Sequence, residues 1–285
     1  MTEDKGYLLD NRQTEAGERF DALAELFDAT TFRHFDALGL APGDGVWEVG
    51  AGGTSVPRGL AERVGPDGRV LATDLDTGWL TGVFLPPNVE VRRHDVGQDE
   101  APSGPFDFVH ARLVLVHVKD RDRALRAMLG ALRPGGILLV EDADPALQPL
   151  LCLDEYGPEQ ERANRLRRGF RALLAERGAD LSYGRKLPRL LRELGLEQVE
   201  ADAYFPVASP AGAVLEAATV RQVRDQLVQR GLASDDEIER HLASVAAGRL
   251  DLATSPMISA WGRRPADASD RRPGGRRAQA AVSYV

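Results

Sequence analysis

Between residues 45 and 144 of this 285-residue chain, short runs that resemble buried strands alternate with amphipathic helical segments. A segment with helical periodicity follows the first run, at residues 56–64, and another follows the fourth run, at residues 121–132. Strands in such a series pair in parallel and connect by right-handed crossovers, so we predict an α/β fold with a doubly wound, mostly parallel sheet. The five strand-like runs lie at 46–49, 70–73, 89–92, 106–109 and 137–140.

The segments on either side of this core are mostly helical in pattern. Apolar spacing predicts two helices at 16–27 and 31–40, so residues 1–44 are expected to form a helical cap. Residues 145–254 are expected to form a helical lid with one late strand at 197–205, and residues 255–264 are expected to form a last strand. With the five strands of the core, the predicted sheet has seven strands. Residues 265–285, rich in Arg, Pro, Gly and Ala, predict a disordered tail, with an anion-binding arm as the alternative.

Composition narrows the class of protein and its partners. A net charge of −8 argues against a nucleic-acid partner, because phosphates require a basic face. The single cysteine, Cys152, excludes an intrachain disulfide and favours a cytoplasmic protein, and no Cys/His spacing predicts a metal site. No apolar stretch has membrane-spanning length, and no signal peptide is recognisable. We expect no membrane partner, and a monomer or a homodimer.

A glycine-rich turn follows the first predicted strand, in the sequence Glu48-Val-Gly-Ala-Gly-Gly-Thr-Ser55. Glycines allow a ligand to approach the backbone without meeting a Cβ atom. The next helix begins there, and its free N–H groups favour an anionic group. The alternative is a tight strand–helix turn that binds nothing.

Acidic residues end the next two predicted strands. Asp74 could accept hydrogen bonds from ribose hydroxyls, and Asp95 could accept one from an adenine amino group. Each alone is an ordinary turn residue, but together after a glycine turn they predict a nucleotide-type cofactor. The dehydrogenase motif fits less well, because it requires Gly or Ala where Ser55 stands, and the Gly-Lys-Ser/Thr of a P-loop is absent.

The segment 48–52 resembles the first motif of class I S-adenosylmethionine-dependent methyltransferases, acid-x-Gly-x-Gly. Asp74, Asp95, the strand 106–112 and Leu132-Arg-Pro-Gly-Gly136 follow in the family's order, although Thr54 replaces a third glycine found in many members. The resemblance covers about residues 1–144 and is closest to the ubiquinone-biosynthesis-like branch of actinobacterial secondary metabolism. It implies a Rossmann-like fold, a substrate lid and S-adenosylmethionine as cofactor, with S-adenosylhomocysteine as product.

The resemblance also implies which residues bind the cofactor. The glycine turn would hold the methionine part with Glu48, Asp74 the ribose, and Asp95 the adenine. Tyr7 would fold over the cofactor, unless it is an ordinary packed residue. The implied cofactor-binding residues are Tyr7, Glu48, Gly50, Ala51, Gly52, Asp74, Leu75, Asp95, Val96 and His110.

Histidine is the natural base near neutral pH, and two histidines lie at or after the fourth predicted strand. His117 and His110 are therefore the candidate catalytic residues, with a purely structural role as the alternative for each. His34 and His241 are expected on helix surfaces. Aromatic residues of the lid region could line a pocket or form the lid's own core; they are Tyr156, Phe170, Tyr183, Tyr204 and Phe205.

These features predict a methyltransferase that acts on an O, N or C atom of a small aromatic or heterocyclic natural-product metabolite. Two alternatives remain open: a relative that catalyses a cyclisation without methyl transfer, and a non-catalytic binding protein on the same fold. A nucleic-acid methyltransferase is disfavoured, because the segment 110–113 is not the catalytic tetrapeptide of that class.

Overall fold

The computed structural model describes residues 8–266 apart from 10, 12 and 14, and contains a seven-stranded sheet of order β3-β2-β1-β4-β5-β7-β6. The first five strands are parallel, and β7 runs antiparallel to both of its neighbours. The predicted doubly wound, mostly parallel sheet of seven strands is therefore confirmed. The strands are β1 (Gly45–Val49), β2 (Arg69–Asp74), β3 (Val89–Arg93), β4 (Phe106–Arg112), β5 (Leu132–Ala143), β6 (Glu197–Tyr204) and β7 (Met257–Arg263).

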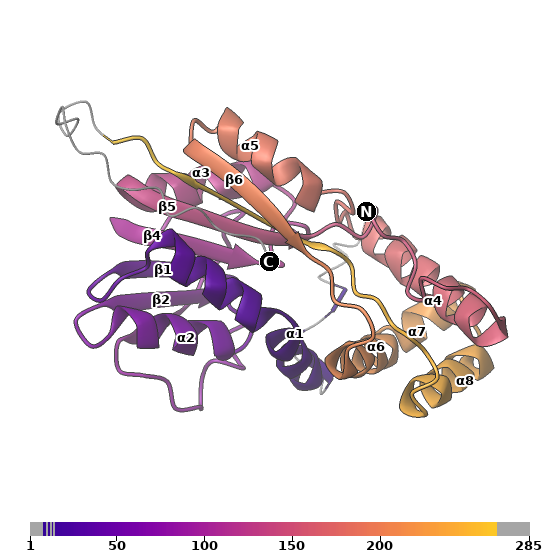
Figure 1. Ribbon diagram of the computed structural model, residues 1–285. Coiled ribbons are helices and arrows are strands. Elements are labelled where there is room, and N and C mark those ends of the chain that lie inside the picture. The colour runs from indigo at the N-terminus through magenta and orange to yellow at the C-terminus, as the bar shows by residue number, and fades with distance from the viewer. Residues whose placement is uncertain (1–7, 10, 12, 14, 267–285) are drawn as a thin grey trace, which may run out of the picture.

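Helices cover both faces of this sheet (Figure 1). Because side chains alternate along a strand, each face has its own apolar core. One core packs the sheet against α3 and α5, and the other packs it against α1 and α2. The helices are α1 (Glu15–Leu38), α2 (Ser55–Val64), α3 (Arg121–Ala131), α4 (Pro158–Glu176), α5 (Leu187–Glu193), α6 (Pro210–Gln222), α7 (Arg224–Gln229) and α8 (Asp235–Ala246).

One continuous helix, α1, replaces the two helices predicted before the sheet, so that prediction was wrong. The residues between the predicted helices, Asp28-Ala-Thr30, include neither glycine nor proline and therefore do not break the helix. The buried face of α1 continues through this segment with Phe27, Thr31 and Phe35. As a result, one end of α1 packs on the sheet and the other reaches α6.

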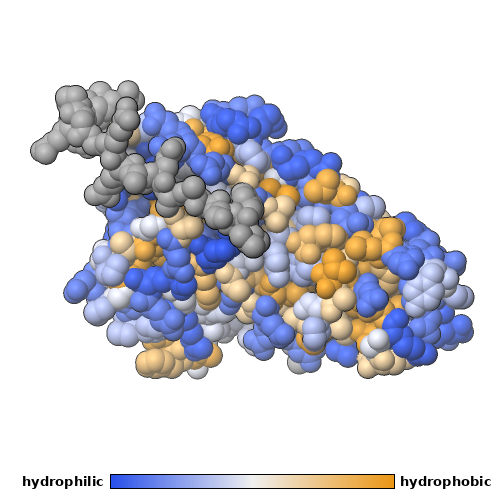
Figure 2. All heavy atoms as spheres, in the orientation of Figure 1, coloured by the Kyte–Doolittle hydropathy of each residue, from blue (hydrophilic) through white to orange (hydrophobic). Residues whose placement is uncertain are grey.

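Four helices form a separate layer beyond the carboxyl ends of the parallel strands, and we call α4, α6, α7 and α8 the lid (Figure 1). The lid has its own core, which includes Leu166, Val223, Leu227 and Ile238. Apolar residues gather on the face shown in Figure 2 between α4 and α6. No helix of the described residues is long and apolar enough to cross a membrane.

Candidate cofactor and acceptor site

A cavity of about 990 Å³ lies between the lid and the carboxyl ends of the strands. Its sheet side is formed by the turns that follow β1, β2, β3 and β4, and its other side by α1, α4 and α6. Ligands of open α/β sheets bind beyond the carboxyl ends of the strands, and this volume is at the upper end of the usual range for small-molecule sites. The cavity therefore has room for a cofactor and a second molecule.

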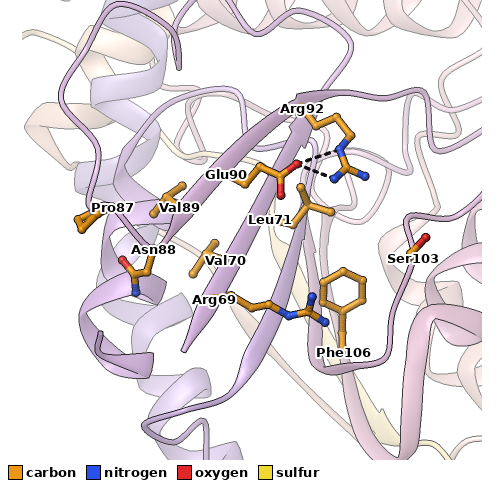
Figure 3. Close-up of a pocket in the computed structure, with 10 residues that line it drawn as sticks. All are labelled: Arg69, Val70, Leu71, Pro87, Asn88, Val89, Glu90, Arg92, Ser103 and Phe106. Carbon is orange, nitrogen blue, oxygen red and sulfur yellow. Dashed lines mark hydrogen bonds and ion pairs between the residues drawn. The ribbon is translucent and has the colours of Figure 1, made fainter. Parts of the chain in front are cut away.

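A smaller cavity of about 250 Å³ lies at the opposite edge of the sheet (Figure 3). It is lined by the first residues of three strands, Arg69 of β2, Val89 of β3 and Phe106 of β4. Amino ends of parallel strands are not where such folds bind their ligands. We therefore assign no cofactor to this cavity.

The glycine turn after β1 lines the large cavity with a backbone that only glycine adopts readily. Gly50 and Gly52 have φ angles of 65° and 60°. A Cβ atom on Gly50 would lie 2.3 Å from a methyl carbon of Val114, and one on Gly52 would lie 2.7 Å from the ring of Phe20. Side chains at these positions would therefore both strain the backbone and fill the turn.

Asp74, at the end of β2, fixes this turn. Its Oδ2 accepts a hydrogen bond from the backbone N–H of Gly52 at 2.8 Å, and its Oδ1 accepts one from that of Asp76 at 3.0 Å. Burial raises the pKa of Asp74, and these backbone hydrogen bonds oppose the rise. A carboxylate has about four acceptor positions, so Asp74 retains capacity for hydroxyl groups of a ligand.

Asp95 is positioned in a similar way after β3. Its Oδ1 accepts from the backbone N–H of Gly97 at 2.9 Å, and its Oδ2 from the side chain of Gln98 at 2.6 Å. Leu75 is 54% exposed, whereas Val96 is buried. The predicted cofactor-binding residues that line the cavity are Gly50, Ala51, Gly52, Asp74, Leu75, Asp95 and Val96.

The side chains of Glu48 and His110 are fully buried on the α1-facing side of the sheet and do not line the cavity. The imidazole of His110 donates to Glu48 Oε2 at 2.5 Å and to Glu141 Oε2 at 3.2 Å. Burial alone would lower the pKa of His110, but Glu48 and Glu141 outweigh it and raise the pKa to about 9. In this position His110 is a structural cation that cannot reach a substrate, and the cofactor contacts proposed for both residues stay predictions.

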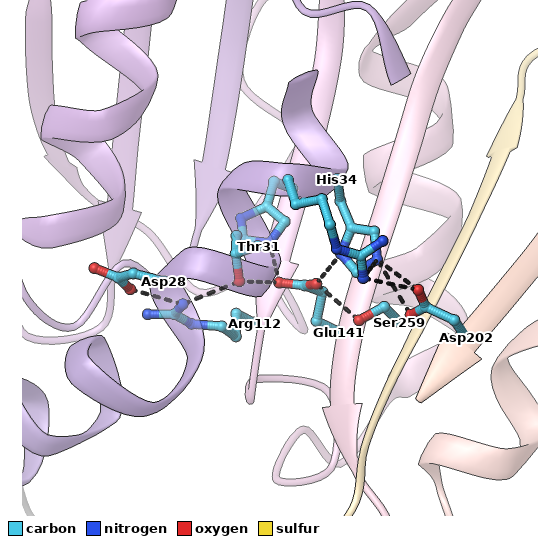
Figure 4. Close-up of polar contacts among 9 residues, drawn as sticks. Asp28, Thr31, His34, Arg112, Glu141, Asp202 and Ser259 are labelled. Atoms are coloured by element: carbon cyan, nitrogen blue, oxygen red, sulfur yellow. Dashed lines mark hydrogen bonds and ion pairs between the residues drawn. The ribbon is translucent and has the colours of Figure 1, made fainter. Parts of the chain in front are cut away.

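Glu141 extends this arrangement into a chain of buried groups between the sheet and α1 (Figure 4). It accepts hydrogen bonds from Thr31 at 2.5 Å, from His34 at 2.9 Å and from Ser259 at 2.8 Å. His34 also donates to Asp202 of β6 at 3.0 Å. We call Glu48, His110, Glu141, His34 and Asp202 the buried carboxylate–histidine chain.

Two further histidines expected on helix surfaces are buried, so that expectation was wrong. His34 is 2% exposed in the buried carboxylate–histidine chain, and His241 is 1% exposed beside Glu216 at 2.9 Å. Both lie on helix faces that pack against segments distant in sequence, which periodicity alone does not reveal. Cys152 is a buried free cysteine.

His117 lines the cavity, in a turn at 114–117 that follows β4 rather than in a helix. Burial and the charges of Arg19 and Arg121 lower its pKa to about 4. The imidazole is therefore neutral near pH 7 and has a lone pair that can accept a proton. Tyr7 and residues 267–285 lie outside the described residues.

Comparison with known proteins adds the family. Residues 42–201, more than half of the chain, match the model of a methyltransferase domain. The chain is a member of the class I S-adenosylmethionine-dependent methyltransferase family. The resemblance noted at the glycine turn and the strand-end acids is thereby confirmed.

The curated relatives of this methyltransferase-family chain align with it over only part of their own length. It is 28% identical over 162 residues to the ubiquinone/menaquinone biosynthesis C-methyltransferase of Laribacter hongkongensis, covering 50% of this chain and 65% of the relative. It is 27% identical over 178 residues to phosphoethanolamine N-methyltransferase 3 of Arabidopsis thaliana, covering 61% and 33%. The alignments therefore span between a third and about two thirds of these relatives.

A solved structure has the same fold. Phosphoethanolamine N-methyltransferase 2 of Haemonchus contortus, in complex with S-adenosyl-L-methionine, superimposes with a TM-score of 0.57 at 13% identity. The superposition covers 93% of this methyltransferase-family chain and 60% of the other. At this identity the likeness is one of fold.

Several cavity residues were not predicted from the sequence of this family member. Four of them are arginines: Arg19 of α1, Arg112 of β4, Arg167 of α4 and Arg177. Arg112 pairs with Asp28 at 2.9 Å, and Arg167 lies 3.7 Å from Glu216. One signal was available for Arg19, because it follows Ala16 by three residues and precedes Leu23 and Leu26 on the apolar stripe of α1.

The aromatic residues of the predicted lid region differ in their surroundings: one lines the cavity, and others lie in a core or at the surface. Phe170 lines the cavity, whereas Tyr183 belongs to the core beneath α3 and α5. Tyr156 is 75% exposed, and Tyr204 packs edge-on against Phe27. Among the residues that the structure describes, no cluster of three or more His, Cys, Asp or Glu side chains is placed to hold a metal ion.

Proposed function

We propose that this protein transfers the methyl group of S-adenosylmethionine to a small aromatic or heterocyclic metabolite. One observation carries the proposal: a single cavity joins the glycine turn and the strand-end acids to His117 and to the apolar interior of the lid. The cofactor side of this cavity has the polar groups that a nucleoside requires. Aromatic residues of α1 and of the lid also line it, among them Phe20 and Phe27 of α1 and Phe170 of α4.

The cofactor fits the groups present. The two glycines expose the backbone of the turn to the cavity, and the free acceptor capacity of Asp74 suits the two ribose hydroxyls. Leu75 would cover one face of the adenine, and Asp95 would accept from its amino group. When bound, the cofactor supplies a methyl group activated by a positive sulfur.

The chain's contribution to the reaction is mainly positional. The acceptor atom attacks the methyl carbon in line, the sulfur–methyl bond breaks, and S-adenosylhomocysteine leaves with the bonding electrons. Holding both partners in one cavity would supply much of the rate, because orientation alone is worth several kcal/mol. The lid and the aromatic residues of α1 form the apolar walls of this cavity.

His117 would receive the proton that an oxygen or nitrogen acceptor releases. Its imidazole is neutral near pH 7, and it lies after β4 on the wall of the same cavity. A carbon acceptor could instead be oriented by the site and lose its proton afterwards. The relatives described above are named for a carbon and a nitrogen acceptor, so the acceptor atom is left open within this proposal.

The experiment that tests the function measures label transfer. The protein is incubated with methyl-labelled S-adenosylmethionine and a panel of phenols, aromatic amines, aromatic acids and quinols. Label in one product with equimolar S-adenosylhomocysteine would support methyl transfer. Conversion of an acceptor without S-adenosylhomocysteine would instead identify the cyclising alternative.

A further inference from the structure

Arg19 is a buried cation in the cavity, and no carboxylate of the described residues pairs with it. The residue is 5% exposed, lines the cavity and extends from α1 toward the end of α6. Its Nη1 donates to the side-chain oxygen of Gln222 at 3.2 Å, and its guanidinium lies 6.0 Å from the ring of Phe20. Among the described residues, no carboxylate forms an ion pair with it, and its Nε–H has no hydrogen-bond partner.

A buried guanidinium is costly unless an anion compensates it, because removing a charge from water costs several kcal/mol. Two of the other cavity arginines have a carboxylate nearby: Arg112 pairs with Asp28, and Arg167 lies 3.7 Å from Glu216. Of these three arginines, Arg19 is the one with no carboxylate beside it among residues that the structure describes. A ligand anion would supply the missing partner.

Three further residues that line the same cavity have a buried polar atom without a hydrogen-bond partner within the described part of the chain. These atoms are Nε of Arg167, Oγ1 of Thr254 and Nδ1 of His94. The neighbouring wall is apolar and includes Leu23, Phe170 and Met257. The cavity therefore combines an apolar surface with unused hydrogen-bond donors, which is the complement of an amphipathic anion.

We propose that the methyl acceptor is an apolar molecule that carries a carboxylate or phosphate group, and that Arg19 binds this group. The proposal rests on the proposed function, since it names the acceptor class of the same cavity. Guanidinium groups bind both oxyanions through paired N–H donors. An anion at this position would also offset one of the two positive charges that lower the pKa of His117, making the imidazole a stronger base when the acceptor is bound.

The test is calorimetric titration of protein saturated with S-adenosylhomocysteine, with benzoate, phenyl phosphate and neutral benzyl alcohol as probes. Arg19→Met should raise the Kd of the anionic probes about 10- to 100-fold, as expected for a lost charge-assisted hydrogen bond, and leave benzyl alcohol unchanged. Arg19→Lys should retain part of the anion affinity. Comparison of the two anions distinguishes a carboxylate site from a phosphate site.

The matched control is Arg126→Met, which removes the same charge from an exposed position in α3. This variant should bind all probes like the wild type. Equal losses in both Met variants, or no anion binding by the wild type, would overturn the proposal. Thermal unfolding of each variant shows that the comparison is made on folded protein.

A second titration separates the acceptor's anion from the cofactor's own carboxylate. S-adenosylhomocysteine has that carboxylate, whereas 5′-methylthioadenosine lacks it. If Arg19→Met weakens only S-adenosylhomocysteine, Arg19 holds the cofactor and the proposal is overturned. If the wild type does not bind S-adenosylhomocysteine, the proposed function fails, and titration of the unloaded protein with the anions still tests Arg19.

Discussion

The buried imidazolium of His110 predicts that stability falls as the pH rises above neutrality. The folded pKa of His110 is about 9, against 6.5 for the unfolded chain. Between these values the folded protein holds a proton that the unfolded chain has released. The stabilisation is therefore complete below about pH 6.5 and is lost as the pH rises through about 9.

The magnitude follows from the two pKa values. Their difference of about 2.5, at about 1.4 kcal/mol per pH unit, gives about 3 kcal/mol in total for this buried group. About half of this loss, 1 to 2 kcal/mol, is expected between pH 7.5 and 9. The pKa of His34 is also raised, because Asp202 and Glu141 outweigh the effect of burial, so His34 acts in the same direction.

Between pH 7.5 and 9, the change in stability reports mainly on the buried carboxylate–histidine chain and not on the other groups with shifted pKa values. Burial raises the pKa of Asp142 to about 7 and, together with nearby arginines, lowers that of His117 to about 4, so both titrate mainly below the window. Burial raises the pKa of Cys152 to about 11, which affects stability mainly above the window.

The assay is urea unfolding of the wild type at several pH values from 7.5 to 9, followed by far-ultraviolet circular dichroism. His110→Gln should show a smaller pH dependence. It should also be less stable by about 3–5 kcal/mol at pH 7.5, because Glu48 and Glu141 lose the cation between them. A free energy of unfolding that is constant or increases from pH 7.5 to 9 in the wild type would refute the assignment of a buried imidazolium.

Three further predictions concern the cavity. Asp74→Ala should weaken S-adenosylmethionine binding by about 1–3 kcal/mol, the cost of leaving hydrogen-bond donors without their charged acceptor, and calorimetry on the folded variant measures it. Gly52→Val should abolish cofactor binding, because the φ of 60° and the ring of Phe20 leave no place for a side chain. The control is Gly130→Val, at an exposed position where a Cβ atom meets no neighbouring atom. Equal cofactor affinity of the two variants would contradict the argument. His117→Ala should reduce kcat about 10²–10⁴-fold while cofactor affinity stays the same, and full activity in single-turnover assays would show that positioning suffices.

The cofactor side of the site could be predicted because its parts are local in sequence. Gly50 and Gly52 lie in the turn after an apolar strand, Asp74 is the last residue of the next strand, and Asp95 is the second residue after the one that follows. Parallel strands bring their carboxyl ends to one edge, so the periodicity of the chain was enough to place these residues near one another. The same periodicity predicted the seven strands.

The acceptor side depended on contacts between distant segments. Arg19 meets the end of α6 across 203 residues, and His34 meets Asp202 across 168. In the sequence both are single polar residues on a helix, and nothing local shows that this face of α1 is covered by β5, β6 and the lid. The continuity of α1 and the burial of His110 between two carboxylates likewise follow from packing against the sheet. Sequence periodicity therefore determined the strands of the sheet and the position of the glycine turn. Long-range packing decided which polar groups are buried and which of them face the cavity, because burial arises only when the layers of the fold are assembled.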